Sequence, residues 1–575
     1  MTLYLVNMKL LKSLVFILLS INLAAQERYA VVIDEIMADP SPQIGLPNNE
    51  WIELKNVSGA SINLQGWRIG DASGQSGAMP KFTLQPDSFV IVCTGSAVAA
   101  LSAFGSTISV TSFPSLDNDG ETIFLKSPAG MVIHAVDYSS SWYANEIKQE
   151  GGWTLEMIDT ESPCSGNTNW KASTDAKGGS PGKKNALDAI NADTGAPQLQ
   201  NAFVIDNQTL QLVFDEPVDS INASIVARYG IDNGNSFTSA LPVSPLFNKV
   251  ELKLTAPLAE NTGYTIHVSN ITDCKGNLID ADNAVRIALP SLPIAGDLAI
   301  NEILFNPRSG ANDYVEVYNK SGKVFDASQI YIANRNTDGV ISSAKQFSST
   351  PRYIFQGEYF VITENAENLS LNYLVKNPEN VLTVSSLPSF PDDKGDVIIT
   401  NMQGDVIDEV KYNKDWHFKL IDNDEGISLE RIDPDRPAAN AANWHSAAST
   451  AGYGTPTYVN SQFKQLQTAD AAIDISPKIF SPDNDGHDDI ATIQYKVSEP
   501  GYVATITIFD AAGRPVRVLV NNSTMALSGY WTWDGLNDKN GKLPIGTYLL
   551  YTEIFNLQGR KKHFKNAIVL ARKLN

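Results

Sequence analysis

The chain has 575 residues, a formal net charge of −21, 43% hydrophobic residues and 19% charged residues. This is the composition of a globular protein, which excludes wholesale disorder, a collagen-like chain, a coiled coil and a disulfide-dense scaffold. The 39 Gly and 29 Pro, with short runs rich in Val, Ile, Thr, Tyr and Phe, indicate strands and turns rather than long helices.

The first 25 residues have the layout of a secretory signal. Lys9 and Lys12 form a basic start, an apolar run follows from Leu14 to Leu19, and small residues precede Gln26. An N-terminal membrane anchor is the alternative, but the apolar run falls short of the roughly 20 residues needed to span a bilayer. We therefore expect export, with removal of residues 1–25 and no transmembrane segment afterwards.

The chain contains an internal repeat, which we call the first repeat (residues 27–185) and the second repeat (residues 296–460). Both are series of short alternating runs separated by turn residues, the pattern of an antiparallel sandwich. Matches in the same order, with little drift in spacing, indicate two copies of one domain. The main matches are Ile33–Pro40 with Ile300–Pro307, Glu50–Asn56 with Asp313–Asn319, Val132–Tyr138 with Val406–Tyr412, Leu155–Asp159 with Leu429–Asp433, Asn169–Trp170 with Asn443–Trp444, and Gly179–Asn185 with Gly454–Asn460.

These motifs resemble the lamin tail domain, an immunoglobulin-like sandwich. The opening "I-N/D-E-I…P", the strand "E-x-I-E-L-x-N", the pair Gly66-Trp67, "LE-x-I-D" and a late Trp occur in the family's order. The second repeat has no equivalent of Gly66-Trp67, which leaves the structure of its early loop open. The resemblance implies a binding or scaffolding module and no catalytic residues.

Several acidic residues in the two repeats suggest acid/base chemistry at first sight. On an alternating strand Glu50 faces away from Glu53, so these two do not form a carboxylate pair. We expect carboxylates that face solvent or satisfy turns. The residues concerned are Glu35, Glu50 and Glu53, and their counterparts Glu302, Asp313 and Glu316.

Residues 195–290 form a middle domain of a different kind. Thr209–Phe214 alternates, Asp215–Val218 turns, and Tyr264–Val268 leads to Asp273–Asn277. The pattern "L-x-F-x-E-P-V … Y-T-x-x-V … D-x-x-G-N" resembles a bacterial Ig-like domain of the S-layer kind. Such domains are spacers.

Residues 472–575 form the C-terminal domain. Its order "SP-x-x-DG-x-x-D … I-x-I-F-D-x-x-G-R … W-D-G … P-x-G-T-Y" resembles the Ig-like domain of flagellar hook-capping proteins. It also resembles the gliding-motility-associated sorting domain of type IX secretion cargo. The second resemblance implies the type IX export and attachment machinery as a partner. Gly513-Arg514 without a following Trp-Gly keeps the spacer interpretation open.

The acidic loop that opens this domain is the best candidate for a ligand site. Calcium prefers several oxygen ligands on a flexible loop, and four carboxylates lie here around Gly486. The spacing is not that of an EF-hand, and an Asx-rich turn is the alternative. The candidate calcium ligands are Asp483, Asp485, Asp488 and Asp489.

Other chemistry has little support. Cys93 and Cys164 are the only two cysteines in one predicted domain, so a disulfide between them is one expectation, and three unpaired thiols including Cys274 is the other. No two histidines form an HExxH or HxH pattern and none lies beside a cysteine, which leaves only a triad assembled in space as a catalytic alternative. The acidic repeats lack the clustered Lys and Arg that bind phosphates, so we expect no nucleic acid partner.

The sequence thus predicts an all-β protein of four Ig-like antiparallel β-sandwich domains in tandem. We expect a non-enzymatic, modular protein for binding, adhesion or scaffolding, secreted or displayed on the outer surface of a Gram-negative, Bacteroidota-like bacterium. Its ligand would be an unknown extracellular protein or glycan. Two alternatives stay open: an extracellular hydrolase using carboxylates of the repeat loops, and a purely structural surface-layer spacer.

Overall fold

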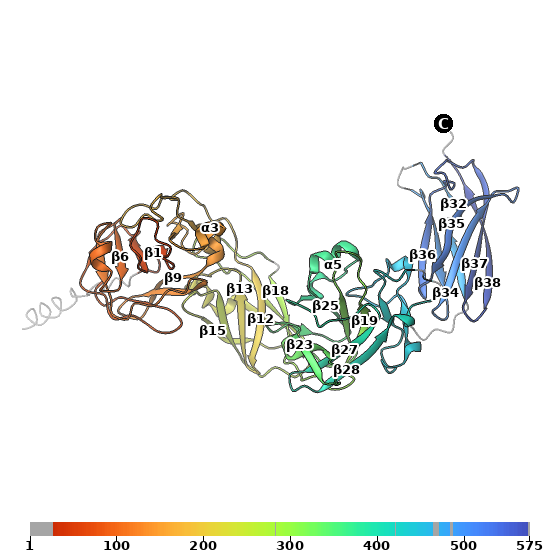
Figure 1. Ribbon diagram of the computed structural model, residues 1–575, viewed down its shortest axis with the longest axis horizontal. Helices are drawn as coiled ribbons and strands as arrows, with labels where there is room; N and C mark the ends of the chain where they lie inside the picture. Colours follow the sequence, from red (N-terminus) through yellow and green to blue (C-terminus); the bar gives the residue numbers. More distant parts are fainter. Residues whose placement is uncertain are drawn as a thin grey trace, which may run out of the picture. The chain divides into compact units, whose positions relative to one another are not determined.

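The computed structural model describes residues 27–281, 283–419, 421, 423–463, 471–483 and 487–572. The predicted signal sequence lies outside these residues. The chain divides into two compact units, Met1–Pro257 with Tyr264–Ile287, and Leu258–Gly263 with Ala288–Asn575. Each unit consists of antiparallel sheets joined by turns and short helices, as Figure 1 shows, which confirms the predicted all-β class.

The first repeat packs a six-stranded sheet, in the order β11-β10-β1-β2-β6-β7, against a three-stranded sheet, β4-β8-β9, with a small pair β3-β5 beside them. All pairs are antiparallel except β6 with β7. The strands are β1 (Val31–Met37), β2 (Trp51–Asn56), β3 (Ile62–Asn63), β4 (Arg68–Gly70), β5 (Thr83–Leu84), β6 (Phe89–Cys93), β7 (Thr107–Ser109), β8 (Gly120–Lys126), β9 (Val132–Ser139), β10 (Leu155–Met157) and β11 (Trp170–Ala172); the helices are α2 (Val98–Leu101), α3 (Glu146–Gln149) and the short 3-10 helices η1 (Ser140–Tyr143) and η2 (Gly166–Asn169).

The second repeat has the same plan. Its six-stranded sheet runs β26-β25-β20-β19-β29-β30 and faces the sheet β23-β22-β27-β28, with the pair β21-β24 beside them. The elements are β19 (Leu298–Leu304), β20 (Tyr314–Asn319), β21 (Phe325–Asp326), η4 (Ala327–Gln329), β22 (Ile330–Arg335), β23 (Ile341–Gln346), β24 (Tyr353–Ile354), β25 (Tyr359–Thr363), α5 (Ala366–Asn372), η5 (Pro378–Asn380), β26 (Val381–Thr383), β27 (Lys394–Asn401), β28 (Val406–Asn413), η6 (Lys414–Trp416), β29 (Leu429–Arg431), η7 (Ala441–Asn443), β30 (Trp444–Ser446) and η8 (Ser449–Ala451).

The two repeats agree beyond strand order. β1 pairs with β2 through a bulge between Ile33 and Glu35, and β19 pairs with β20 through a bulge between Ile300 and Glu302. The tryptophan pairs Trp142–Trp170 and Trp416–Trp444 both have ring centroids 6.3 Å apart. The early part of the second repeat, which the sequence left open, carries the additional edge strand β23 after β22.

The middle domain packs the sheet β12-β13-β16-β15 against the sheet β14-β17-β18. In β13 every second residue is buried, the alternation expected of a strand with one face on the core. The elements are β12 (Leu199–Asp206), β13 (Thr209–Phe214), α4 (Ser220–Ala223), η3 (Val226–Arg228), β14 (Tyr229–Ile231), β15 (Phe237–Pro242), β16 (Lys249–Leu254), β17 (Tyr264–Val268) and β18 (Ala284–Ile287).

The C-terminal domain packs the sheet β31-β33-β36 against the sheet β32-β38-β37-β34-β35. Its core includes Trp533 and Phe480, whose rings lie 5.1 Å apart between the two sheets. The strands are β31 (Ala472–Ser476), β32 (Ile479–Phe480), β33 (Ala491–Lys496), β34 (Tyr502–Phe509), β35 (Pro515–Thr524), β36 (Ser528–Trp533), β37 (Gly546–Asn556) and β38 (Lys561–Leu570).

The central strands β1 and β19 are buried along their whole length. One face of each six-stranded sheet lies on the main core, and a smaller apolar cluster under α2 or α5 covers part of the other face. Because both faces are covered, the acidic residues of these strands cannot reach solvent. We expected from strand alternation that one face of these strands would be exposed to solvent. This expectation does not hold for β1 and β19.

A disulfide joins Cys164 to Cys274, with 6.2 Å between their Cα atoms, and Cys93 is buried and free. The expected Cys93–Cys164 pair is therefore wrong, because Cys93 lies inside β6 while Cys164 lies on a loop that faces the middle domain. The same face holds Arg28, whose guanidinium lies 4.2 Å from the centre of the Phe247 ring. The first repeat and the middle domain are thus joined covalently and by packing within one unit.

Candidate functional site

The predicted calcium loop is only partly described. Asp485 lies outside the described residues, while Asp483, Asp488 and Asp489 lie on the turns before β33. The carbonyl of Asp488, which has a φ of 51°, accepts a hydrogen bond of 2.9 Å from the Ser481 N–H. Among the described residues, these carboxylates do not come within reach of a common ion. The calcium site stays a prediction.

Three glutamates form a row across the centre of each six-stranded sheet. In the first repeat Glu35 pairs in register with Glu53 on one side and with Glu156 on the other. In the second repeat Glu302 pairs in the same way with Glu316 and Glu430. All these side chains have zero exposure to solvent. We call these two rows the carboxylate rows.

The carboxylate rows hold the segment that closes each repeat, Gly179–Asn185 or Gly454–Asn460, which we call the closing segment. In the first repeat the backbone N–H of Ser180 donates to Glu35 Oε1 at 2.7 Å, and that of Gly182 donates to Glu53 Oε1 at 2.6 Å. The Ser180 hydroxyl donates to Glu156 Oε1, also at 2.7 Å. The closing segment is therefore bound to all three strands that carry the row.

The second repeat uses equivalent donors. Thr455 N–H donates to Glu302 at 2.9 Å, and its hydroxyl donates to Glu430, also at 2.9 Å. Thr457 N–H donates to Glu316 at 2.6 Å, although Thr457 has a φ of 72°, a conformation that is costly for a β-branched residue. Ionic or neutral, a buried carboxyl group needs such partners.

An asparagine ends the closing segment in both repeats. The Asn185 amide donates to the carbonyls of Asp34 and Met157 at 3.0 and 2.9 Å. The Asn460 amide makes the same two bonds to Asn301 and Arg431, both 2.9 Å long. The asparagine thereby satisfies carbonyls of two neighbouring strands.

Burial shifts the ionisation of the carboxylate rows. It raises the pKa of Glu35 and Glu53 well above the usual range, with further increases from Glu156 on Glu35 and from Glu35 on Glu53. Burial, followed by repulsion from Glu302, likewise raises the pKa of Glu316, and it raises that of Glu430 to about 8. A carboxyl group without solvent access resists ionisation.

The expectation of solvent-facing carboxylates is therefore wrong for Glu35, Glu53, Glu302 and Glu316. These residues do satisfy a turn, but the turn comes from a segment more than 120 positions away along the chain. We also did not assign a role to Glu156 and Glu430, although the matching "LE-x-I-D" pattern places both in equivalent positions of the repeats.

Glu50 and Asp313 lie outside the carboxylate rows. Glu50 Oε2 accepts a 3.1 Å hydrogen bond from the Leu116 N–H, in the segment before β8. Burial, followed by repulsion from Asp392 and Glu364, raises the pKa of Asp313 to about 7. Neither residue belongs to the strand pairs that carry the rows.

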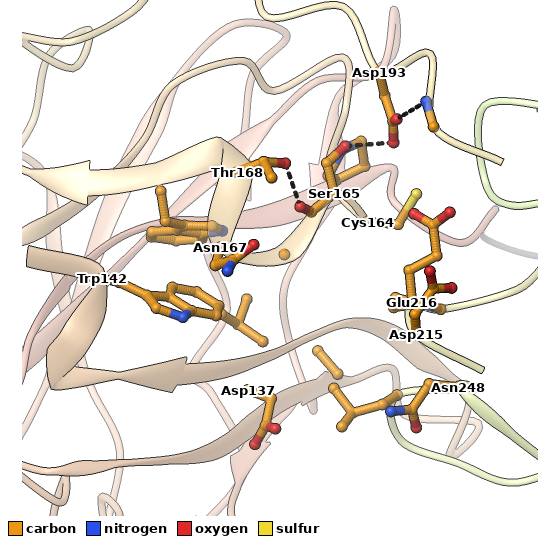
Figure 2. A pocket seen from close by; sticks show the side chains of 18 of the residues that line it. Asp137, Trp142, Cys164, Ser165, Asn167, Thr168, Asp193, Asp215, Glu216 and Asn248 are labelled. Carbon is orange, nitrogen blue, oxygen red and sulfur yellow. Dashed lines mark hydrogen bonds between the residues drawn. The ribbon is translucent and has the colours of Figure 1, made fainter. Parts of the chain in front are cut away.

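A pocket of about 580 Å3 lies between the first repeat and the middle domain, inside the first unit. Figure 2 shows Trp142 on one side and Asp193, Asp215 and Glu216 on the other. Trp142 forms the tilted pair with Trp170, whose exposure is only 3%. We call this site the acidic pocket.

The acidic pocket has a one-sided charge. Its lining includes the carboxylates of Asp137, Asp193, Asp215 and Glu216, and no lysine, arginine or histidine among the described residues. Burial, followed by repulsion from Asp193, raises the pKa of Glu216 to about 8. The pocket is therefore suited to a positively charged group, which would relieve this repulsion.

Its walls are held in place by local bonds. The Ser165 hydroxyl donates to Asp193 Oδ2 at 2.7 Å, and the Gly195 N–H donates to Asp193 Oδ1 at 3.0 Å (Figure 2). Cys164 Sγ lies within 4.8 Å of carboxylate oxygens of Asp193 and Asp273. Because this sulfur belongs to the disulfide, it is not a thiolate ligand for a metal. Sequence analysis missed this pocket, since its two walls come from different domains.

Family models match three segments of the chain. The model of the lamin tail domain matches residues 24–140 and 293–414, and the model of a bacterial Ig-like domain matches residues 189–286. A comparison with curated proteins found no match. Among the described residues, no helix has the length and apolar character needed to cross a membrane.

Solved structures with some similarity include surface and adhesion proteins. The N-terminal part of the bacterial S-layer protein SbsC is 18% identical over 29% of this chain and 39% of its own, with a TM-score of 0.16. A tandem repeat from the extending region of a large adhesion protein is 11% identical over 94% and 99%, with a TM-score of 0.14. Dimeric latent PorU from Porphyromonas gingivalis is 10% identical over 70% and 35%, with a TM-score of 0.15.

The chain spans less than two thirds of the first S-layer structures that it matches. At these TM-scores the similarities carry no argument about function. The family models describe lamin-tail and Ig-like modules rather than enzyme families. Together with the shared topology of the repeats, they identify the chain as a modular protein that carries two lamin tail domains, one on each side of a bacterial Ig-like domain.

Proposed function

We propose that this chain is an exported, non-enzymatic modular protein that binds a ligand at the cell surface or outside the cell. The observation that carries the proposal is the Cys164–Cys274 disulfide between the first repeat and the middle domain. Disulfides form and persist in oxidising compartments outside the cytosol. The signal-like sequence of residues 1–25 agrees with this location.

The burial of the carboxylate rows supports a non-enzymatic role. A general acid or base must come within hydrogen-bond distance of the substrate. Glu35, Glu53 and Glu156 have no exposure and bind the closing segment, and their counterparts in the second repeat do the same. A hydrolase that used these acids would first have to lose the closing segment.

The acidic pocket is the place where we expect the ligand. The face of a tryptophan attracts a cation through its π electrons, and desolvated carboxylates nearby add to this attraction. The ligand class is therefore a cationic group of an extracellular protein or glycan, such as a lysine side chain or an amino sugar. A structural spacer would have no such ligand.

Binding of oligoglucosamine and of oligolysine to the full-length mature chain tests this site. We expect saturable binding that weakens with salt and is lost, by tenfold or more, in Trp142→Ala and Glu216→Gln. Trp416→Ala is the matched control, because Trp416 forms the same pair with Trp444 in the second repeat but lies outside the acidic pocket. Equal binding by Trp142→Ala and the control would favour the spacer.

For the C-terminal domain we propose a sorting role, with the type IX export and attachment machinery as its partner. This rests on the resemblance of its sequence motifs. Deletion of residues 472–575 should leave the protein in the periplasm, with the remaining domains folded. Protease treatment of intact cells measures surface display, and the Cys164–Cys274 bond, detected on non-reducing gels, reports folding. Normal display of the shortened chain would make this domain a spacer.

A further inference from the structure

The two carboxylate rows differ in their supply of hydrogen-bond donors. In the second repeat, Asn301 Nδ2 lies 2.7 Å from both Glu316 Oε1 and Asn460 Oδ1. This single amide group therefore supplies hydrogens to two buried acceptors. Asn301 is itself buried, with 2% exposure.

The first repeat has Asp34 at the position of Asn301. The strand register, the bulge and the two bonds of the closing asparagine are the same in both repeats, so Asp34 occupies the equivalent place. An ionised aspartate is only an acceptor, whereas the asparagine amide is a donor. The replacement thus brings acceptors together without a hydrogen between them.

The unpaired atoms of the first repeat match this loss. Asp34 Oδ1, Asn185 Oδ1 and Glu53 Oε2 are buried and have no hydrogen-bond partner among the residues that the structure describes, and the same holds for Glu35 Oε2 in the same row. Asp34, Glu53 and Asn185 have exposures of 1, 0 and 7%. Leaving such oxygens unpaired in the interior is costly, and most when they are charged.

We propose that the first repeat binds a proton at a site formed by Asp34, Glu53 and Asn185, and that this proton holds the closing segment in place. The protonated Asp34 carboxyl then donates to one of the two neighbouring oxygens, as the Asn301 amide does in the second repeat. The proton comes from solvent and returns to it on ionisation. No other bond is made or broken.

A metal ion fits this place less well than a proton. Mg²⁺ and Ca²⁺ take six or more oxygen ligands at about 2.0–2.6 Å. The site offers three unpaired oxygens, and the 2.7 Å spacing around Asn301 in the second repeat accommodates a hydrogen atom between heavy atoms rather than an ion.

The electrostatic surroundings agree with a bound proton near neutral pH. Burial raises the pKa of Asp34 to about 7, against a lowering by Lys55 and with further increases from Glu156 and Asp188. Asp34 in turn contributes to the raised pKa of Glu53. The other charged groups around the row are Glu35 on β1, Lys148 on α3 and Lys183 in the closing segment, and a hydrogen bond to Asp175, followed by the carboxylate of Glu156, raises the pKa of Lys183.

The sign of the pH effect follows from these values. The pKa of Asp34 is higher in the folded protein than the usual value of about 3.9 in an unfolded chain. The stabilisation is therefore complete below pH ~4 and is lost as the pH rises through about 7. We expect the closing segment of the first repeat to open more often at pH 8 than at pH 6.

Hydrogen exchange in the full-length mature chain tests the proposal. The Gly182 and Thr457 amides are reporters, because each donates directly to the equivalent glutamate, Glu53 or Glu316. After correction for intrinsic exchange, the protection of Gly182 should fall between pH 6 and pH 8 by about tenfold more than that of Thr457, as expected for one additional proton with a pKa near 7.

Reciprocal variants provide the control. Asp34→Asn should reduce the pH-dependent loss at Gly182 by about tenfold, and Asn301→Asp should increase that at Thr457, because the glutamates of both rows contribute to the loss in every variant. His134, a buried histidine on β9, is present in wild type and in Asp34→Asn, so its own titration cancels in their comparison. If Asp34→Asn does not fold, Asn301→Asp still tests the proposal in the other repeat.

Two results would overturn the proposal. The first is an unchanged pH dependence at Gly182 in Asp34→Asn, or a pH dependence at Thr457 that does not increase in Asn301→Asp. The second is protection at Gly182 that rises with added Mg²⁺ or Ca²⁺ and falls with chelator, because a metal ion rather than a proton would then occupy the site.

Discussion

The two lamin tail domains meet the same backbone requirement with different side chains. The bulge in the central strand leaves one N–H outside the β-ladder, that of Ile33 or Ile300. In the first repeat His134 Nδ1 accepts it at 2.9 Å, and in the second repeat Asp408 Oδ2 accepts it at the same distance. The backbone geometry is thus more constant between the repeats than the chemistry that supports it.

Each acceptor brings its own surroundings. Burial lowers the pKa of His134 to about 4, so it is neutral and its second nitrogen faces the Pro163 carbonyl. Asp408 instead forms an ion pair of 2.6 Å with Arg431, which is 3% exposed and replaces Met157 of the first repeat. The two repeats thus differ at both positions together.

Asp408→Ala should give the largest effect in this comparison. It leaves the Arg431 guanidinium buried without its carboxylate, which costs about 3–5 kcal/mol in comparable cases. The double variant Asp408→His with Arg431→Met copies the arrangement of the first repeat and should recover most of this loss. Urea unfolding of the full chain, followed by hydrogen exchange in β29, measures both. A loss below 1 kcal/mol in Asp408→Ala would contradict the role of the pair.

Asn460→Ala and Asn185→Ala should give the next largest losses in the free energy of unfolding. Each removes two hydrogen bonds to buried carbonyls, at about 1–3 kcal/mol for every group left unpaired. Asn460→Ala should cost about 1 kcal/mol more, because Asn460 Oδ1 also accepts a bond from Asn301 while Asn185 Oδ1 has no partner among the described residues. Exchange at Thr457 and Gly182 in the two variants gives the difference. A larger loss for Asn185→Ala would reverse this ranking.

Tyr314→Phe should give the smallest effect. The Tyr314 hydroxyl donates to Glu302 Oε1 at 2.6 Å, and its loss from a buried carboxyl group costs about 1–2 kcal/mol. The first repeat has Trp51 at this position, and its indole nitrogen has no partner among the described residues. Tyr318→Phe is the control, because this half-buried ring keeps its stacking on Tyr359. Equal free energies of unfolding for the two variants would show that the Tyr314 hydroxyl does not stabilise the carboxylate row.

Much of the fold could be predicted from the sequence, because short local patterns of apolar and turn residues indicate the strands and turns of each repeat. The alternation in Trp51–Leu54 and the turn at Asp117–Gly120 define strand and turn by themselves. The burial of Glu35 and Glu53 could not be read in this way. It depends on the closing segment, which lies far along the chain and covers a face that strand alternation assigns to solvent.

The acidic pocket could not be predicted either, because it also depends on segments that lie far apart along the chain. Trp142 and Glu216 have ordinary sequence surroundings, and only the packing of two domains brings them to one site. The disulfide was predicted wrongly because we assumed that a pair would lie inside one domain. Cys274 follows Asp273 on the turn after β17, and that turn faces the first repeat rather than the core of its own domain.

The Cys164–Cys274 bond also determines how this chain would respond to mechanical tension. A pulling force that enters through the first repeat crosses from Cys164 to Cys274 along the sulfur bridge. The stretch between the two cysteines, which are separated by 110 positions and enclose most of the middle domain, then carries no load. Fully extended, that stretch would span roughly 380 Å at about 3.5 Å per residue. As long as the disulfide is intact, this stretch cannot be extended by the force. The two walls of the acidic pocket therefore stay together when the chain is pulled.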